Sequence, residues 1–238
     1  MLVAAAVCPC PPLLVPEVAA GAAPELDGLR AACADAVGVL AASRPDRLVV
    51  IGPAALPGRG VFAQGSPGSF REFGVPVDVT LGTRPQDAAD EPVRTLPPSL
   101  AVGAWLLRGW SAAPVEGLGV GEDLEQERCA AAGRAVAESA GRVAALVMGD
   151  GSACRTLKAP GYLDERAEPF DAAVSAALAG ADPRALAGLD AELARALKAA
   201  GRAPWQVLAG AAEHAGLAGE LLHEASPYGV AYFVAAWT

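Results

Sequence analysis

Short, uninterrupted apolar runs alternate along this chain with longer segments in which apolar residues recur three or four positions apart. Uninterrupted runs of this length are typical of strands that are buried on both faces. They span residues 2–7, 47–51 and 143–148, and a fourth strand is expected at 115–120, where a glutamate and two glycines interrupt the apolar residues. The longer segments have the spacing of amphipathic helices. Strands that alternate with helices predict an α/β protein, and we expect a single domain over residues 1–238, with a largely parallel central sheet and helices on both of its faces.

Proline, aspartate and glycine mark the ends of the predicted elements. Helices are expected to begin near Pro24, Ser99, Asp123, Pro169, Asp182, Asp190 and Pro204. Residues 219–225 and 230–237 are predicted to pair as a hairpin across a short turn that contains proline. Residues 76–81 resemble a further short strand. The segments 52–74 and 84–98 are rich in glycine and proline, so we expect long surface loops there.

The run at 143–148 leads directly into the sequence Gly-Asp-Gly-Ser at residues 149–152. Glycines are expected at such a turn because they permit backbone angles that other residues avoid. A polar loop follows, and then a helix with Asp171 in its first turn, where a carboxylate suits the helix dipole. Ligands of parallel sheets bind outside the carboxyl ends of the strands. We therefore predict that the ends of this run and of the runs at 2–7 and 47–51 border one cleft.

Composition narrows the class of protein. The formal net charge is -9 at pH 7, which excludes a nucleic-acid surface built from clustered lysine and arginine. Hydrophobic residues make up 53% of the chain but aromatic residues only 5%, so we expect a core of valine, leucine and alanine. No lysine or arginine precedes the opening apolar stretch, and its prolines would break the helix of a signal peptide. We therefore expect a cytoplasmic protein without membrane contact.

The chain has five cysteines without regular spacing, which favours reduced thiols over a disulfide framework.

Several short motifs, in order along the chain, resemble one known family. They read VCPCPPLL from Val7, IGPA from Ile51, GDGSA from Gly149, and APGY from Ala159 with a following Phe170-Asp171 pair. The first is similar to the Pro-His-Pro-Pro start of the class III extradiol ring-cleavage dioxygenases and their Memo-like relatives. The second and third resemble that family's second strand end and its Gly-Asp-Leu-Ser-His segment. The resemblance covers most of the chain and implies an extradiol-dioxygenase-like fold.

In that family, histidines at the strand ends carry the chemistry: two help to hold ferrous iron, and a third acts as acid and base beside the catechol. Imidazole suits both tasks because it binds iron and exchanges protons near neutral pH. This chain has Cys10, Ala54 and Ala153 at the matching positions. Its two histidines, His214 and His223, match none of the family's ligands. The resemblance therefore implies that the Fe²⁺ site has been lost, and we expect neither a metal nor a cofactor.

These observations lead us to expect a non-catalytic homologue of the dioxygenases that reuses the inherited cleft. Its expected role is to bind a small molecule or to take part in an assembly, such as a homo-oligomer. The residues expected to line or rim the cleft are Cys8, Cys10, Ala54, Asp150, Ser152, Ala153, Tyr162 and Asp171.

An active enzyme is the alternative. Cys8 and Cys10, with carboxylates, are candidate ligands for non-haem iron or zinc in an oxidoreductase of the same type. Two cysteines at a strand end are more often small apolar fillers. Cys10 and Cys154 are alternative candidates for thiol chemistry, although no histidine lies beside Cys154 in the sequence.

The polar loop also has two interpretations. The turn at 149–152, with Arg155 and Lys158 nearby, is a candidate anion cradle. It lacks the lysine spacing of a phosphate-binding P-loop, so a polar loop that caps the sheet is the simpler interpretation. Asp171 is likewise a candidate for no more than a carboxylate at a helix start.

Overall fold

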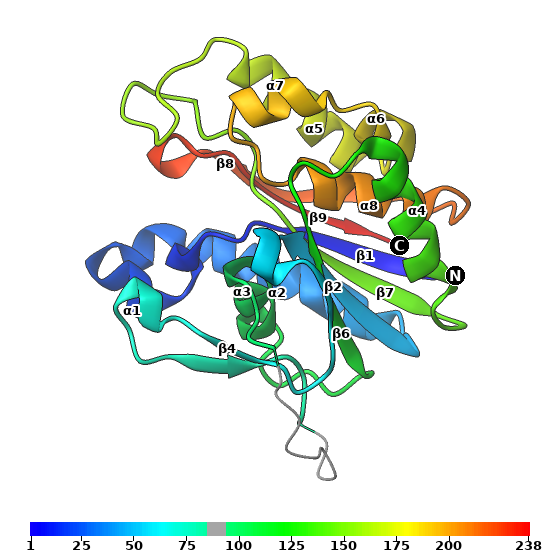
Figure 1. The fold of residues 1–238 in the computed structure, drawn as a ribbon. Helices are drawn as coiled ribbons and strands as arrows, with labels where there is room; N and C mark the ends of the chain where they lie inside the picture. Colours follow the sequence, from blue (N-terminus) through cyan, green and yellow to red (C-terminus); the bar gives the residue numbers. More distant parts are fainter. Residues whose placement is uncertain (85–93) are drawn as a thin grey trace.

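One central sheet of seven strands organises the protein, as the computed structural model shows for residues 1–84 and 94–238 (Figure 1). In sheet order the strands are β3 (Gly60–Phe62), β6 (Val115–Val120), β2 (Arg47–Pro53), β7 (Val143–Met148), β1 (Leu2–Cys8), β9 (Tyr232–Trp237) and β8 (Gly219–Ala225). The strands β6, β2, β7 and β1 are parallel, whereas β3, β9 and β8 pair antiparallel at the two sides. The four parallel strands therefore end at the same edge of the sheet.

Both faces of the sheet are buried, which explains why its central strands are apolar along their length. Every residue of β7 is buried, and its side chains alternate between two cores: Ala145 and Val147 face one, and Leu146 and Met148 face the other. In β1 the alanines at residues 4–6 are all fully buried. Because these side chains are small, the helices lie close to the sheet.

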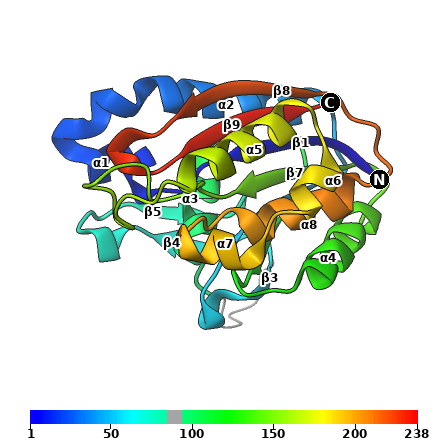
Figure 2. The same ribbon diagram turned by 90° about the horizontal axis from the view of Figure 1, so that it is seen from above.

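Helices cover both faces of the sheet, as predicted (Figures 1 and 2). One face carries α2 (Asp27–Ala42) and α3 (Pro98–Leu106). The other side of the sheet holds α4 (Gln126–Glu138), α5 (Ala167–Ala179), α6 (Pro183–Ala187), α7 (Ala191–Ala196) and α8 (Arg202–Ala212). A short helix, α1 (Pro16–Ala19), precedes α2, and a separate pair of strands, β4 (Pro67–Ser69) and β5 (Asp78–Thr80), packs on α3. None of the helices in the described part of the chain is long and apolar enough to cross a bilayer.

Helix α8 is buried along its whole length and is held by glycine contacts. A Cβ atom on Gly210 would lie 2.6 Å from the Ala130 Cα of α4, and Gly133 of α4 has similarly little space. Gly201, which precedes α8, approaches Gly149 at the end of β7, where an added Cβ would lie 2.5 Å from the Gly201 Cα. These contacts fix the start of α8 against the carboxyl edge of the sheet.

The predicted strands and the C-terminal hairpin are confirmed, and the helices differ mainly in where they begin. α5 begins at Ala167 rather than at Pro169, and α8 begins at Arg202 rather than at Pro204. Proline is tolerated throughout a first turn because the N–H groups there have no partner within the helix. Proline therefore marks the first turn of these helices but not its first residue.

The surface loop predicted at 52–74 is wrong. This segment contains β3 and β4, and the aromatic rings of Phe62 and Phe70 are fully buried. Strands of three residues are too short to produce a periodic pattern, so glycine and proline dominated the prediction. β5 is likewise shorter than the strand predicted at 76–81. Of the predicted loop at 84–98, residues 85–93 lie outside the described residues, and α3 already begins at Pro98.

Candidate functional site

The residues that follow the four parallel strands gather at one edge of the sheet. They are Cys10 after β1, Ala54 after β2, Glu122 after β6 and Asp150 after β7. The neighbouring ends are hydrogen-bonded to one another, since the Ala54 N–H donates to the Val120 carbonyl at 2.8 Å. The edge that the sequence predicts from three strand ends is thus formed by four.

A cleft with a volume of about 630 Å³ opens at this edge, and we call it the strand-end cleft. It is lined by Cys10, Ala54, Ala55 and Glu122 and, at the start of α3, by Pro98 and Ser99, among others. The Ser99 hydroxyl donates to the Pro53 carbonyl at 2.6 Å, so it is already engaged with the backbone. The cleft therefore has mostly apolar walls, and the polar groups in its lining include the carboxylates of Glu72 and Glu122.

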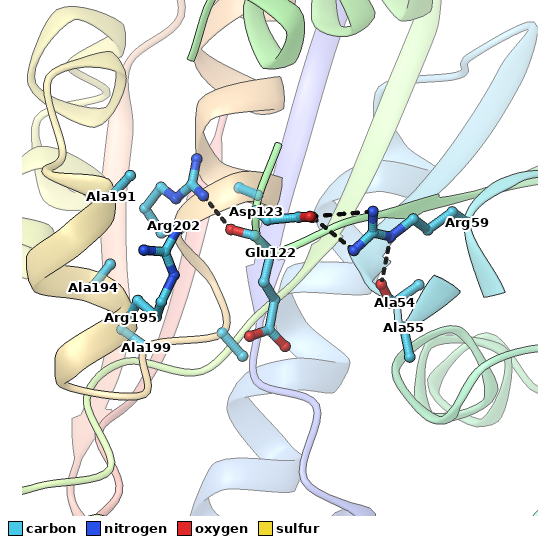
Figure 3. Close-up of a pocket in the computed structure, with 12 residues that line it drawn as sticks. Ala54, Ala55, Arg59, Glu122, Asp123, Ala191, Ala194, Arg195, Ala199 and Arg202 are labelled. Carbon is cyan, nitrogen blue, oxygen red and sulfur yellow. Dashed lines mark hydrogen bonds and ion pairs between the residues drawn. The ribbon is translucent and has the colours of Figure 1, made fainter. Parts of the chain in front are cut away.

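A smaller hollow of about 370 Å³ adjoins the strand-end cleft and shares Ala54, Ala55 and Glu122 with it. We call it the arginine pocket, because it is lined by Arg59, Arg195 and Arg202 (Figure 3). Figure 3 shows Arg195 and Arg202 on the side of α7 and α8, and Arg59 on the opposite side. Two hollows therefore meet at the same strand ends.

The arginines of this pocket differ in their partners. Arg59 forms an ion pair with Asp123 at 2.6 Å. Arg202 is only 3% exposed. It donates to the Leu124 carbonyl at 2.7 Å, to the Gln206 side-chain oxygen at 2.9 Å and to the Glu122 carbonyl. Arg202 is therefore a buried cation held by uncharged oxygens.

Cys10 and Asp150 are joined directly. The Cys10 N–H donates to the Asp150 carboxylate at 2.8 Å, and burial raises the pKa of this half-buried carboxyl to about 6. Burial and the carboxylates of Asp150 and Glu122 raise the pKa of the Cys10 thiol well above its usual value. Burial, with Asp150 nearby, also raises the pKa of Tyr232 in β9. Cys10 and Tyr232 thus stay protonated at neutral pH, whereas Asp150 changes charge just below it.

The glycines at the end of β7 are needed for space rather than for unusual backbone angles. Neither Gly149 nor Gly151 has a positive φ, so the sequence-based explanation for them is wrong. A Cβ atom on Gly151 would lie 2.7 Å from the Phe233 ring and 2.9 Å from the Asp171 carboxylate. The turn is therefore closely packed, with no spare room for backbone movement.

Ser152 and Asp171 form a buried polar cluster beneath this turn. Both residues are fully buried. The Asp171 carboxylate accepts the Ser152 N–H at 2.9 Å and the Ser152 hydroxyl at 2.6 Å, and it pairs with Arg155 at 3.2 Å. These contacts join the turn to α5, and they leave neither side chain facing the strand-end cleft.

The other predicted residues lie elsewhere. Cys8 is fully buried, and a hydrogen bond to Cys33 of α2, together with burial, raises the pKa of its thiol. Ala153 is buried, and its N–H donates to the Leu197 carbonyl at 2.9 Å. The Tyr162 side chain is 63% exposed on the loop. Of the eight predicted residues, Cys10 and Ala54 line the strand-end cleft, Asp150 supports Cys10, and the structure does not bring the rest to the same surface.

Cys154 does not have the surroundings of a nucleophile. It is buried, and its thiol donates to the Leu197 carbonyl at 3.4 Å. Burial and the nearby Asp164 carboxylate raise the pKa of this thiol. A nucleophilic cysteine requires a lowered pKa, because the thiolate is the reactive form. The same argument applies to Cys10.

The sequence reasoning missed the arginines of the second hollow and also Glu122, which lines both hollows. Glu122 follows β6 directly, within the sequence Gly-Val-Gly-Glu-Asp, and its side chain is exposed at the junction of the two hollows. The signal was available, because the predicted strand at 115–120 ends at a glycine and two acidic residues. Applying the strand-end rule to all four parallel strands finds it.

The donor groups at this edge do not fit a non-haem iron centre. Such iron is held by imidazole and carboxylate together. Here Ala54 presents a methyl group, and the Cys10 thiol is held in its protonated form. Within residues 1–84 and 94–238, no three histidine, cysteine, aspartate or glutamate side chains gather closely enough to hold a metal ion.

Comparisons with known proteins bear on the fold alone. No protein-family model matches the chain, and no curated protein matches it either. Among solved structures, it is similar to the crystal structure of the uncharacterized protein JW3007 from Escherichia coli K12, with 13% sequence identity and a TM-score of 0.52. The match covers 99% of each chain. This similarity supports one α/β domain with a mixed, mostly parallel sheet.

We predict that Asp171→Ala lowers the free energy of unfolding by roughly 3 kcal/mol, because it leaves Ser152 and Arg155 without their buried anionic partner. Urea denaturation at pH 7.5 measures the change. Asp35→Asn, at an exposed position in the middle of α2, is the control and should change stability by less than about 0.5 kcal/mol. A similarly small effect of Asp171→Ala would contradict the structural role assigned to this carboxylate.

Asp150 should make stability depend on pH. Its pKa is about 6 in the folded protein, which lies above the value of a free aspartate, so the unfolded chain loses this proton first as the pH rises. The contribution of Asp150 to the free energy of unfolding should therefore fall between about pH 4 and pH 6, by roughly 3 kcal/mol for a shift of about two units.

Asp150→Asn tests this, because asparagine still accepts the Cys10 N–H but does not ionise. The variant should be more stable than the wild type at pH 7.5 and should match it near pH 4, as measured by urea denaturation across that range. An unchanged slope between these pH values would show that another group is responsible.

Proposed function

We propose that the protein is a non-catalytic homologue of the class III extradiol dioxygenases and that it binds a small molecule in the strand-end cleft. One observation carries the proposal: an open cleft of about 630 Å³ lies beside Cys10 and Ala54, two positions at which the resembled family has histidines. The motifs after β1, β2 and β7 supply the resemblance.

The chemistry of the cleft favours binding over catalysis. Pockets of roughly 300–1,000 Å³ with mostly apolar walls are typical of small-molecule sites. The Ala54 methyl group cannot transfer a proton, and the Cys10 thiol is held protonated. Its N–H is already bound to Asp150. A ligand in this cleft would be bound by apolar contacts and a few polar groups, and the lining described above supplies no activated nucleophile.

A ligand screen tests the proposal. We expect at least one small aromatic compound from a panel of catechol, benzoate, 3-phenylpropionate and their neutral amides to raise the melting temperature. At a concentration of about 100 times Kd, the gain is about 2.7 kcal/mol, or roughly 5–10 °C for a chain of this size.

Ala55→Trp should abolish the rise, because residue 55 is exposed and lines the cleft, so that the indole occupies ligand space. Ala172→Trp, at an exposed position of α5, is the matched control and should retain it. Either a panel without any binder or an Ala55→Trp variant that binds as tightly as the wild type would overturn the proposal.

The folded protein should not require a metal ion for its stability. The purified protein is expected to hold no stoichiometric iron or zinc, because Cys10 and Ala54 stand where the resembled family has imidazole. Chelator should then leave the melting temperature unchanged, unlike that of a domain whose metal-binding energy is part of its folding energy. Near-equimolar metal by elemental analysis, or a lower melting temperature in chelator, would contradict this expectation.

A further inference from the structure

The charges that line the arginine pocket are not balanced within it. Arg59 is neutralised by Asp123 at 2.6 Å. Arg195 and Arg202 line the opposite wall and form no ion pair with a carboxylate of the described residues. With the Glu122 carboxylate at the border, the three arginines and two carboxylates that line the hollow leave one excess positive charge, in a protein whose overall charge is -9. Such a local excess of positive charge attracts an anion.

Arg202 is positioned as a recognition group rather than as a surface charge. Its Nη1 donates to the Leu124 carbonyl and the Gln206 side chain, and its Nη2 donates to the Glu122 carbonyl. A guanidinium has five N–H donors, so these bonds leave donors that have no acceptor among the described residues. The contacts hold the guanidinium in one orientation, and a preorganised fork suits the two oxygens of a carboxylate. Arg202 also opens α8, where the helix dipole favours an anion.

Most of the other lining residues of the pocket are alanines. They include Ala191 and Ala194 of α7, Ala199 between α7 and α8, Ala203 of α8 and Ala54 of the strand-end cleft. Their methyl groups fit the hydrocarbon part of an organic acid. The carboxylate of Glu122 borders the hollow as well, and it would repel a doubly charged anion more than a singly charged one.

We propose that the arginine pocket is a carboxylate-binding subsite of the strand-end cleft, with Arg195 and Arg202 as the groups that bind a small organic monocarboxylate. The shared residues Ala54, Ala55 and Glu122 connect the two hollows, so that one ligand can place its carboxylate on the arginines and its apolar body in the cleft. This assignment rests on the proposed function, since it specifies the chemical class of the ligand that the cleft holds.

Calorimetric titration with matched pairs of probes tests the assignment. Benzoate and 3-phenylpropionate are compared with benzamide and 3-phenylpropionamide, which have the same shape without the charge, and with inorganic phosphate. At least one acid should bind about 10-fold or more tightly than its amide, because a charge-assisted hydrogen bond is lost in the amide.

Arg195→Gln should weaken binding of that acid by about 10-fold or more and leave binding of the amide unchanged. Arg195 is exposed, so the variant is expected to fold, and circular dichroism checks this. Arg128→Gln, which removes an exposed charge from α4 outside both hollows, is the matched control and should bind like the wild type. Arg202→Lys keeps the positive charge but loses the planar pair of N–H donors, so it should also weaken binding of the acid.

The outcomes separate the subsite from the cleft. If acid and amide bind equally, and only Ala55→Trp abolishes binding, the cleft holds ligands and the carboxylate subsite is refuted. If phosphate binds as tightly as the acids and Arg195→Gln weakens both, the pocket is a general anion site and the monocarboxylate assignment is overturned. If no probe binds to the wild type, the proposed function fails together with the subsite.

Discussion

The close contact between the end of β7 and the start of α8 is the constraint on which the rest of the site depends. Gly149 and Gly201 meet with no room for a Cβ atom, and Gly133 and Gly210 bring α8 equally close to α4. Backbone rather than side chain therefore decides how far α8 stands from the sheet. This distance places the first residue of α8 beside the strand ends, and so it brings a buried arginine to an edge otherwise formed by β1, β2, β6 and β7.

The electrostatics of the edge follow from this arrangement. On the side of β1 and β7, burial favours the neutral forms of Cys10 and Tyr232 and makes Asp150 easy to protonate. On the side of α7 and α8 lie the guanidinium groups of Arg195 and Arg202. The two sides meet at Glu122, the exposed carboxylate that both hollows share. The positive charge at this edge therefore lies on the side of α7 and α8, and carboxylates lie in the strand-end cleft and at its junction with the arginine pocket.

The sequence predicted the central sheet well because its signals are local. Continuous apolar runs identify strands that are buried on both faces, and aspartates at helix starts act as predicted, since Asp182 and Asp190 accept backbone N–H groups of α6 and α7. The prediction for residues 52–74 failed because three-residue strands are held by tertiary pairing and have no periodic pattern of their own.

For the candidate site, the sequence predicted the location but not all of the residues that form it. The strand-end rule located the cleft beside Cys10 and Ala54, and Glu122 was missed only because the rule was applied to three strands. Arg202 lies far from the motifs in the sequence, and nothing local distinguishes it from a solvated arginine.

The many alanines of this chain are not equivalent, and the difference limits how the protein can evolve. Alanines 4–6 of β1 are fully enclosed between helix layers, so any enlargement there overpacks the core. Ala54 and Ala55 instead border open volume on two sides, in the strand-end cleft and in the arginine pocket. The Ala55 side chain is exposed whereas that of Ala54 is buried, so residue 55 is where a larger side chain disturbs the sheet least. Single substitutions at residue 55 therefore change the shape of both hollows, whereas an enlarged side chain in the β1 core has to displace its neighbours.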